Sequence, residues 1–205
     1  MFFVQSCSVC NAETESGVFC PACRSKELLL EAMPGLLNLD GAVMGYKYSG
    51  ALKDMLHKLK FEGESKFLQP LAEEAVFLAQ AYGESSFDMV VSVPTDAARR
   101  KQRGFDIPEN IFAQALAVKG AWQPQVLARI KATAPQYGLT PDKRRSNVHG
   151  CFAVQGDVRG KKILLVDDIL TTGATLDEAA KTLKQAGAKS VYALTLCGSL
   201  ENFKD

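Results

Sequence analysis

Residues 163–175 have the sequence ILLVDDILTTGAT. The apolar residues at its start predict a buried strand of a parallel sheet, because such strands are covered by helices on both faces. Two adjacent acids, Asp167 and Asp168, follow where we expect this strand to end. Open α/β sheets bind their ligands at the carboxyl ends of their strands. The stretch therefore predicts both an α/β fold and a ligand site.

A helix is expected directly after this strand. Thr175 and Glu178 have the spacing of a capping box, and Gly187 fits the position just past the helix. The backbone N–H groups of residues 171–175 and the positive end of the helix would attract a phosphate. Since the neighbouring acids can accept hydrogen bonds from vicinal hydroxyls, the pattern predicts a site for ribose 5-phosphate. Apolar residues on one helical face support the helix: Leu176, Ala179, Ala180 and Leu183.

Other classes of protein also place acids after an apolar strand. A phosphorelay receiver needs a whole doubly wound domain after its acids, and only 37 of the 205 residues follow Asp168. A P-loop NTPase needs the pattern G-x-x-x-x-G-K-[ST]. The nearest stretch, Gly156–Lys162, has three residues between its glycines and a lysine in place of the Ser or Thr. An ordinary strand–turn–helix with solvated acids stays open, but the Thr-Thr-Gly-Ala-Thr sequence favours a phosphate site.

The six cysteines suggest a metal site. Four of them form two C-x-x-C pairs separated by nine residues, and four thiolates complete the tetrahedral shell of a structural zinc ion. A disulfide interpretation needs an oxidising compartment, and a thioredoxin-like site would need only one such pair. About twenty residues cannot bury a core of their own, so we expect zinc to hold the segment together. The predicted ligands are Cys7, Cys10, Cys20 and Cys23, whereas Cys151 and Cys197 are expected in the core.

Composition agrees with a cytoplasmic protein. A chain of 205 residues that is 47% hydrophobic suits one main domain with a small appendage. The net charge of +1 gives no general attraction to nucleic acid or membrane. No apolar segment approaches the ~20 residues of a membrane span, and the N-terminus lacks a signal-peptide core. We therefore predict no membrane insertion.

The rest of the sequence alternates strand and helix patterns. Helices are expected after Ser49, after Gly63 and from Asp106, which has Glu109 at capping-box spacing. Two polar segments separate these elements, a basic connection at 95–106 and a loop from Lys131 to Asn147. Such alternation predicts a mostly parallel sheet with helices on both faces. Further strands are expected at 43–48, 87–93, 126–130, 151–154 and 191–197.

Val166–Thr175 resembles the motif that binds 5-phosphoribosyl-1-pyrophosphate (PRPP) in type I phosphoribosyltransferases. The whole chain resembles ComF-type competence proteins, which join an N-terminal cysteine segment to such a domain. This resemblance implies a type I phosphoribosyltransferase fold with a small zinc-binding module, divided into a zinc-ribbon-like segment at 1–35 and a phosphoribosyltransferase-type domain at 36–205. Weaker supporting motifs are Tyr48-Ser49-Gly50 with Lys60-Phe61, Arg103-Gly104-Phe105, and Gln136 and Leu139 followed by Arg144 and Asn147.

The resemblance also implies roles for residues. The two acids would hold the ribose and, through water, Mg²⁺, while Arg103 and Arg144 would stabilise the departing pyrophosphate. Residues 136–147 resemble the hood that closes over PRPP in related glutamine amidotransferases. The family usually has Asn and Gln after Arg-Gly-Phe, whereas this chain has Asp106 and Ile107. The implied PRPP-binding residues are Asp167, Asp168, Thr171, Thr172, Gly173, Ala174, Thr175 and Gln136.

Two functions follow from these expectations. One is Mg²⁺-dependent transfer of ribose 5-phosphate from PRPP to an unknown acceptor. The other is a non-catalytic competence factor that senses PRPP or binds single-stranded DNA and works with the DNA-uptake machinery. Basic segments at 99–103 and 143–145 would contact DNA phosphates. A complete glutamine amidotransferase is not expected, because Cys7 is committed to a metal pair.

Overall fold

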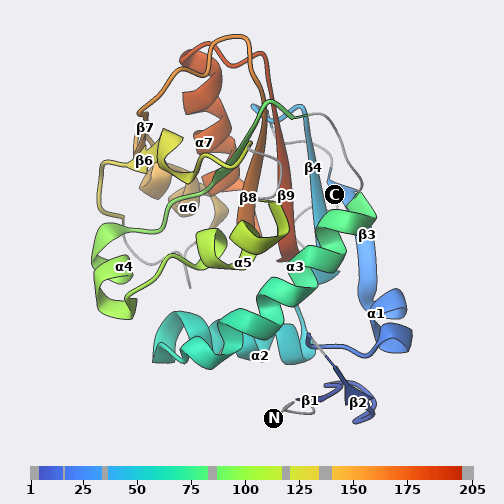
Figure 1. Ribbon diagram of the computed structural model, residues 1–205. Coiled ribbons are helices and arrows are strands. Elements are labelled where there is room, and N and C mark those ends of the chain that lie inside the picture. Colours follow the sequence, from blue (N-terminus) through green and yellow to red (C-terminus); the bar gives the residue numbers. More distant parts are fainter. Residues whose placement is uncertain are drawn as a thin grey trace.

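The computed structural model describes residues 5–15, 17–33, 37–82, 87–116, 121–133 and 140–199. Five of the described strands form one sheet in the order β3-β4-β9-β8-β5 (Figure 1). The last four in this order run parallel, and β3 is antiparallel to β4. The type I phosphoribosyltransferase fold expected from the sequence is confirmed. The strands are β3 (Leu28–Met33), β4 (Gly41–Lys47), β5 (Met89–Ser92), β8 (Lys162–Leu170) and β9 (Ser190–Gly198).

Helices cover both faces of this sheet, and side chains alternate along the strands to meet them. In β8, Ile163 and Leu165 face one core cluster, while Leu164 and Val166 face the other. The helices α2, α3 and α5 contribute to the core cluster on one face of the sheet, and α6 and α7 contribute to the cluster on the other. In Figure 1, α3 and α5 pass in front of the strands and α2 lies below them. Their bounds are α2 (Gly50–His57), α3 (Leu68–Tyr82), α5 (Ile107–Leu116), α6 (Pro141–Val148) and α7 (Ala174–Gln185).

Shorter elements complete the described chain. A five-residue π-helix, η1 (Lys58–Glu62), continues α2, and a 3-10 turn, η2 (Ser65–Phe67), leads into α3. Another 3-10 turn, η4 (Pro124–Val126), leads into β6. The two-stranded antiparallel pairs are β1 (Gln5–Ser6) with β2 (Glu13–Thr14), and β6 (Leu127–Arg129) with β7 (Phe152–Val154). Two short helices are α1 (Pro21–Glu27) and α4 (Ala97–Arg103).

Several expected elements differ from those observed. The connection at 95–106 contains α4, whose N-cap Asp96 accepts a hydrogen bond from the Ala98 N–H at 3.1 Å. The polar segment before Asn147 contains α6, which begins after the capping residue Thr140. The strands expected at 126–130 and 151–154 pair with each other instead of joining the main sheet. Polar helices lack the apolar periodicity on which the sequence expectation depended.

The N-terminal segment enters the main sheet directly. β3 follows α1 and pairs with β4, although its residues lie in the segment that we assigned to a separate module. The division at residue 35 stays a prediction. Within the described ranges, no helix is both long enough and apolar enough to span a membrane.

Candidate functional site

The two acids lie inside β8, not after it as expected. Asp167 pairs with Thr195 of β9, and the ladder continues to Leu170. Both acids are largely buried, at 9% and 5% exposure. The ladder on either side of them therefore holds their backbone in the strand, since Asp167 and Ile169 are both paired with β9. The Asp167 carboxylate accepts a hydrogen bond from the Asp168 N–H at 2.8 Å, which fixes its side chain.

Lys60 of η1 forms an ion pair with Asp168. Its Nζ lies 2.9 Å from Oδ1 and 2.8 Å from Oδ2 of the carboxylate. Burial opposes the charge on Lys60, but the Asp168 carboxylate outweighs it and raises the pKa of the amine. Burial, followed by the charge of Asp168, raises the pKa of Asp167 well above its usual value. The Lys60 cation therefore lies beside two neighbouring acids, Asp167 and Asp168, and it is paired with the second.

Sequence reasoning assigned no role to Lys60, although Lys60-Phe61 was among the supporting motifs. A signal was present, because Lys60 lies four residues after Leu56 and eight after Leu52, both fully buried. A lysine at the end of an apolar helical stripe is costly to bury unless it is paired. Its partner, 108 residues away along the chain, could not be identified from spacing alone.

The loop after β8 leads directly into α7. Gly173 is the N-cap residue, with φ of 72°, and the helix begins at Ala174. The expected capping box of Thr175 and Glu178 is therefore wrong, because Thr175 already lies within the helix. A small hollow of about 20 Å³ is lined by Asp167 and residues 169–176. One acid and the whole expected phosphate loop thus border the same space.

Glu178 has a different role from the expected one. Its carboxylate accepts a hydrogen bond from the Gly150 N–H at 2.8 Å and lies 3.7 Å from Nδ1 of His149. These contacts attach the end of α6 to α7. The expectation that Gly187 follows the helix is confirmed, since α7 ends at Gln185 and Gly187 has φ of 99°.

Arg144 lies next to the loop at 171–175. It projects from α6, and its Nη1 donates to Oγ1 of Thr171 at 3.0 Å. Arg103 lies at the end of α4, within electrostatic reach of Asp168. Burial, together with the charge of Arg99, lowers the pKa of Arg103, and the carboxylate of Asp168 acts in the opposite direction. Gln136 lies outside the described residues.

Asp106, the residue that departs from the family pattern, organises the turn after β5. Its Oδ2 accepts from the Thr95 N–H at 2.7 Å, and its Oδ1 accepts from the Glu109 N–H at 3.4 Å. The latter contact confirms Asp106 as the start of α5. Burial outweighs these hydrogen bonds and raises the pKa of Asp106. A carboxylate thus fixes the backbone at the carboxyl end of β5.

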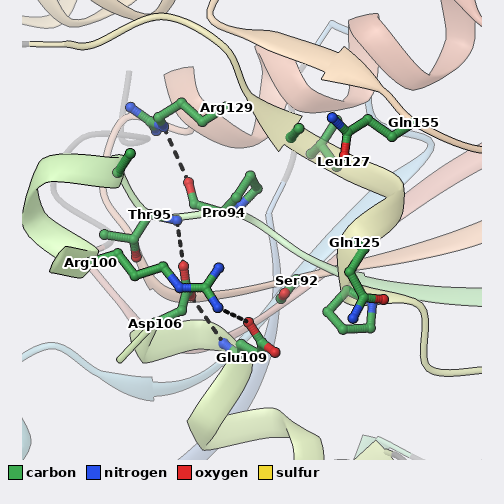
Figure 2. Close-up of a pocket in the computed structure, with 13 residues that line it drawn as sticks. Ser92, Pro94, Thr95, Arg100, Asp106, Glu109, Gln125, Leu127, Arg129 and Gln155 are labelled. Atoms are coloured by element: carbon green, nitrogen blue, oxygen red, sulfur yellow. Dashed lines mark hydrogen bonds and ion pairs between the residues drawn. The ribbon is translucent and has the colours of Figure 1, made fainter. Parts of the chain in front are cut away.

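A larger cavity of about 260 Å³ lies beside this turn (Figure 2). Its lining includes Arg100 and Arg129 as well as Asp106 and Glu109. Nη2 of Arg100 lies 3.9 Å from Oε2 of Glu109, and Nε of Arg129 donates to the Pro94 carbonyl at 3.2 Å. Cationic and acidic side chains therefore both line this cavity.

The four expected metal ligands lie together. Their Sγ atoms are all within 4.8 Å of one another, and those of Cys10 and Cys20 are 3.7 Å apart. Sulfurs at a Zn–S distance of about 2.3 Å in a tetrahedron are roughly 3.8 Å apart. Burial alone would raise the pKa of Cys7, but backbone N–H groups at Cys20, Cys10 and Val9 lower it to about 6. The cluster therefore has the ligand type and spacing of a structural zinc site. Cys151 and Cys197 are fully buried in the core, as expected.

Glu74 of α3 attaches the cysteine segment to the main sheet. It is fully buried, and its Oε1 accepts from the N–H groups of Val18 and Phe19 at 2.8 and 3.1 Å. Its Oε2 accepts from Nε of Arg24 at 2.9 Å and from the Tyr46 hydroxyl at 2.8 Å. The second cysteine pair is therefore fixed to α3, although the sequence places Glu74 on an otherwise ordinary helix.

Comparisons with known proteins agree with this arrangement. Residues 115–204 match the phosphoribosyl transferase domain family. DNA utilization protein YhgH of Salmonella typhimurium is 33% identical over 159 residues, which are 75% of this chain and 70% of that protein. Competence protein ComFC of Streptococcus pneumoniae is 30% identical over 201 residues, 93% of this chain and 86% of that protein.

A solved structure gives a weaker likeness. A hypoxanthine-guanine phosphoribosyltransferase from Bacillus anthracis is 19% identical, with a TM-score of 0.43, and the match covers 66% of this chain and 72% of that one. The sequence relatives, the matched domain and the four clustered cysteines identify the family. The chain belongs to the ComF-type competence proteins, which carry a phosphoribosyltransferase domain.

Proposed function

We propose that this protein binds PRPP and transfers its ribose 5-phosphate to an acceptor. The hollow shared by Asp167 and the loop at 171–175 carries this proposal. Backbone N–H groups at the start of α7 and the hydroxyls of Thr171, Thr172 and Thr175 would hold the 5-phosphate, with Gly173 and Ala174 allowing close approach. The two acids would accept hydrogen bonds from the ribose hydroxyls beside it.

The transfer breaks the bond between C1 of the ribose and an oxygen of pyrophosphate. The bonding electrons leave with pyrophosphate, and the acceptor nucleophile forms a new bond to C1 and loses its proton. Positive charge develops on the ribose and negative charge on the leaving oxygens. Arg103 at the end of α4 and Arg144 of α6 would stabilise the leaving group by charge-assisted hydrogen bonds. Gln136 is proposed as a further PRPP contact.

The residues of this site fit Mg²⁺. Asp167, Asp168 and the Thr171 hydroxyl offer oxygen donors, which this ion prefers, and it commonly keeps several waters when it binds through carboxylates. We propose that the two acids hold it through water. When bound with PRPP, Mg²⁺ would offset the charge on pyrophosphate.

We further propose that the four cysteines hold one structural zinc ion. Thiolates at this separation match its tetrahedral geometry, and a segment this short gains its stability from the metal. We propose a cytoplasmic location, where thiols stay reduced and PRPP would be available.

The alternative is a competence factor that senses PRPP or binds single-stranded DNA. The relatives named for competence and DNA utilization favour this alternative. Exposed cations on α4 and α6 also favour it, among them Lys101, Lys143 and Arg145. Under this alternative the DNA-uptake machinery would be the partner.

Two measurements test these functions. Calorimetry with PRPP and Mg²⁺ should show binding, and absence of binding would refute both PRPP proposals. A screen of candidate acceptors that monitors pyrophosphate release should then identify turnover. PRPP binding with no release for any nucleobase, amine or nucleic-acid acceptor would favour the sensor, and tight binding of single-stranded DNA would favour the DNA-binding alternative.

A further inference from the structure

The helix α4, which carries Arg103, is held by few apolar contacts. None of its seven described residues is buried. A helix this short is not stable in water by itself, because its first hydrogen-bonded turn is costly to form. Phe105, just beyond its last residue, packs against the core and anchors that end. The position of the other end must therefore depend on polar contacts.

The polar contacts at the start of α4 converge on Thr133, which follows β6. The Thr133 N–H donates to Oδ2 of Asp96 at 3.4 Å, and its carbonyl accepts from Nη2 of Arg99 at 3.2 Å. Its Oγ1 accepts from Nη1 of Arg129 at 2.6 Å. Each polar group of this threonine is thus bound to a charged side chain. We call this group the Thr133 clasp, and its members are Asp96, Arg99, Arg129 and Thr133.

Asp96 joins the clasp to the helix itself. It is 7% exposed, and its Oδ1 accepts from the Ala98 N–H at 3.1 Å as the N-cap of α4. Burial alone would raise the pKa of Asp96, but the N–H groups of Thr133, Ala98 and Arg99 lower it. A charged carboxylate therefore caps the helix with one oxygen and holds Thr133 with the other.

Arg129 joins the clasp to the end of β5. Its Nε donates to the Pro94 carbonyl at 3.2 Å (Figure 2), and its guanidinium lies 5.0 Å from the centre of the Phe152 ring on β7. Because the planar guanidinium presents its donors in a fixed fork, one side chain sets the separation of Pro94 and Thr133. The clasp therefore ties β5, α4 and the chain leaving β6 together at one point.

The clasp bears on the proposed chemistry through Arg103. This residue occupies the last turn of α4, within electrostatic reach of Asp168. A helix anchored at both ends keeps its last turn in one direction, whereas a helix anchored only at Phe105 can pivot. Since a displacement of about 1 Å can remove much of the effect of a catalytic group, the clasp controls what Arg103 contacts.

We propose that Arg129 and Thr133 are positioning residues of the pyrophosphate subsite, which hold α4 so that Arg103 can contact the leaving group of PRPP. The inference rests on the proposed function, because it takes PRPP as the ligand. Neither residue needs to touch the ligand itself. Their effect should therefore appear only where pyrophosphate is bound, and it should pass through Arg103.

The test compares, by calorimetry, binding of PRPP with Mg²⁺ and binding of ribose 5-phosphate, which lacks the pyrophosphate. Arg129→Gln should weaken PRPP binding by about tenfold, as expected for a lost charge-assisted contact, and leave ribose 5-phosphate binding within about twofold of wild type. Thr133→Val, which removes only the hydroxyl contact and keeps the side-chain shape, should weaken PRPP binding by about threefold. Thr133→Ser should behave as wild type, because it keeps the hydroxyl.

A double-mutant cycle tests whether Arg129 acts through Arg103. Arg103→Gln should itself weaken PRPP binding, and adding Arg129→Gln should then cause little further loss. Lys131→Gln is the matched control, because it removes an exposed cation of the same segment that is not a member of the clasp. This control should bind PRPP as the wild type does.

Three outcomes would overturn the inference. Unchanged PRPP binding in both Arg129→Gln and Thr133→Val would show that the clasp does not position Arg103. Equal losses for PRPP and ribose 5-phosphate would show a general structural role, and full additivity with Arg103→Gln would show that Arg129 acts independently. If Arg129→Gln does not fold, Thr133→Val alone and combined with Arg103→Gln decides the question.

Binding of PRPP with Mg²⁺ to the wild-type protein separates the two levels of the argument. If it is present, such results refute only the role of the clasp. If it is absent, the proposed function falls and this inference with it.

Discussion

Asp168 contacts the neighbouring strand through its backbone and the residues of the proposed site through its side chain. Its carbonyl accepts from the Cys197 thiol at 3.6 Å, and its carboxylate holds Lys60. We expect Asp168→Asn to weaken Mg²⁺-dependent PRPP binding by more than about tenfold, because a charged acceptor and its pair with Lys60 are both lost. Calorimetry measures the change. Asp157→Asn, at an exposed acid that pairs with Arg159, is the matched control, and equal affinity in wild type and Asp168→Asn would refute the assignment.

Gly173 is required for its backbone conformation. Its φ of 72° lies in the left-handed region, where a β-branched side chain is strained by about 1–3 kcal/mol. Gly173→Val should lower the melting temperature and weaken PRPP binding by moving the loop. Gly173→Asn should lose less of both, because asparagine tolerates this region. If the two variants had equal melting temperatures, the backbone would not be the reason for this glycine.

At the level of residues, functional groups that lie close together in the sequence could be predicted, whereas pairs of residues far apart along the chain could not. The acids, the residues of the loop and the four cysteines could be selected from the sequence because each set lies within a short segment. Lys60 and Glu74 could not, since their roles depend on partners far away along the chain. The cap at Thr175 was assigned wrongly because the helix begins earlier than the pattern indicated. β8 runs to Leu170 and α7 begins at Ala174, so the loop between them is short and Thr175 lies inside the helix.

The element that most affects the proposed chemistry is α6. Its Arg144 reaches Thr171 of the phosphate loop, and its end is attached to α7 through Glu178. We expect Arg144→Ala to reduce PRPP affinity or turnover about tenfold by removing a charge-assisted contact to pyrophosphate. Arg145→Ala, at an exposed neighbouring position, serves as the control.

Limited proteolysis distinguishes a hood from a DNA contact at the same element. PRPP with Mg²⁺ should slow tryptic cleavage at Lys143, because a closed hood exposes less backbone. Cleavage that is indifferent to PRPP would contradict the hood. If α6 instead contacts DNA, Arg144→Ala should weaken DNA binding and reduce its salt slope by about one unit.

Elements with strong apolar patterns were predicted from the sequence, and polar or irregular ones were not. The central strands and the helices α2, α3, α5 and α7 were found, with bounds shifted by a few residues. The helices α4 and α6 were missed because their residues are almost entirely polar. β3 was missed because its register shifts between Leu28 and Glu31, where Leu30 has φ of 48°, and because it adjoins the cysteines.

At the level of the whole molecule, a cysteine variant tests whether the N-terminal segment can unfold without disturbing the main sheet. Cys20→Ser should release the zinc, with the loss of much of the ~10–16 kcal/mol typical of structural sites. We expect the disorder to spread through the segment before β3 and to stop there, since β3 pairs with β4. PRPP affinity should change little, because the proposed site lies on β8, two strands beyond β4 in the sheet.

Elemental analysis of protein purified without chelator, together with calorimetry, checks this expectation. We expect one zinc ion per chain in the wild-type protein and a lower zinc content in Cys20→Ser. Cys151→Ser, at a core cysteine outside the cluster, should keep its metal and is the matched control. Wild-type protein without zinc would be inconsistent with a structural metal site.

The position of β9 has a consequence for how the chain is made. This strand comes last along the described chain, yet it lies in the middle of the sheet, between β4 and β8. Because the chain emerges from the ribosome N-terminus first, β4 and β8 each keep an unpaired edge until β9 is synthesised. Unpaired apolar strands are prone to aggregate, and such distant pairings form slowly. The nascent protein should therefore depend on chaperones until its last strand closes the sheet.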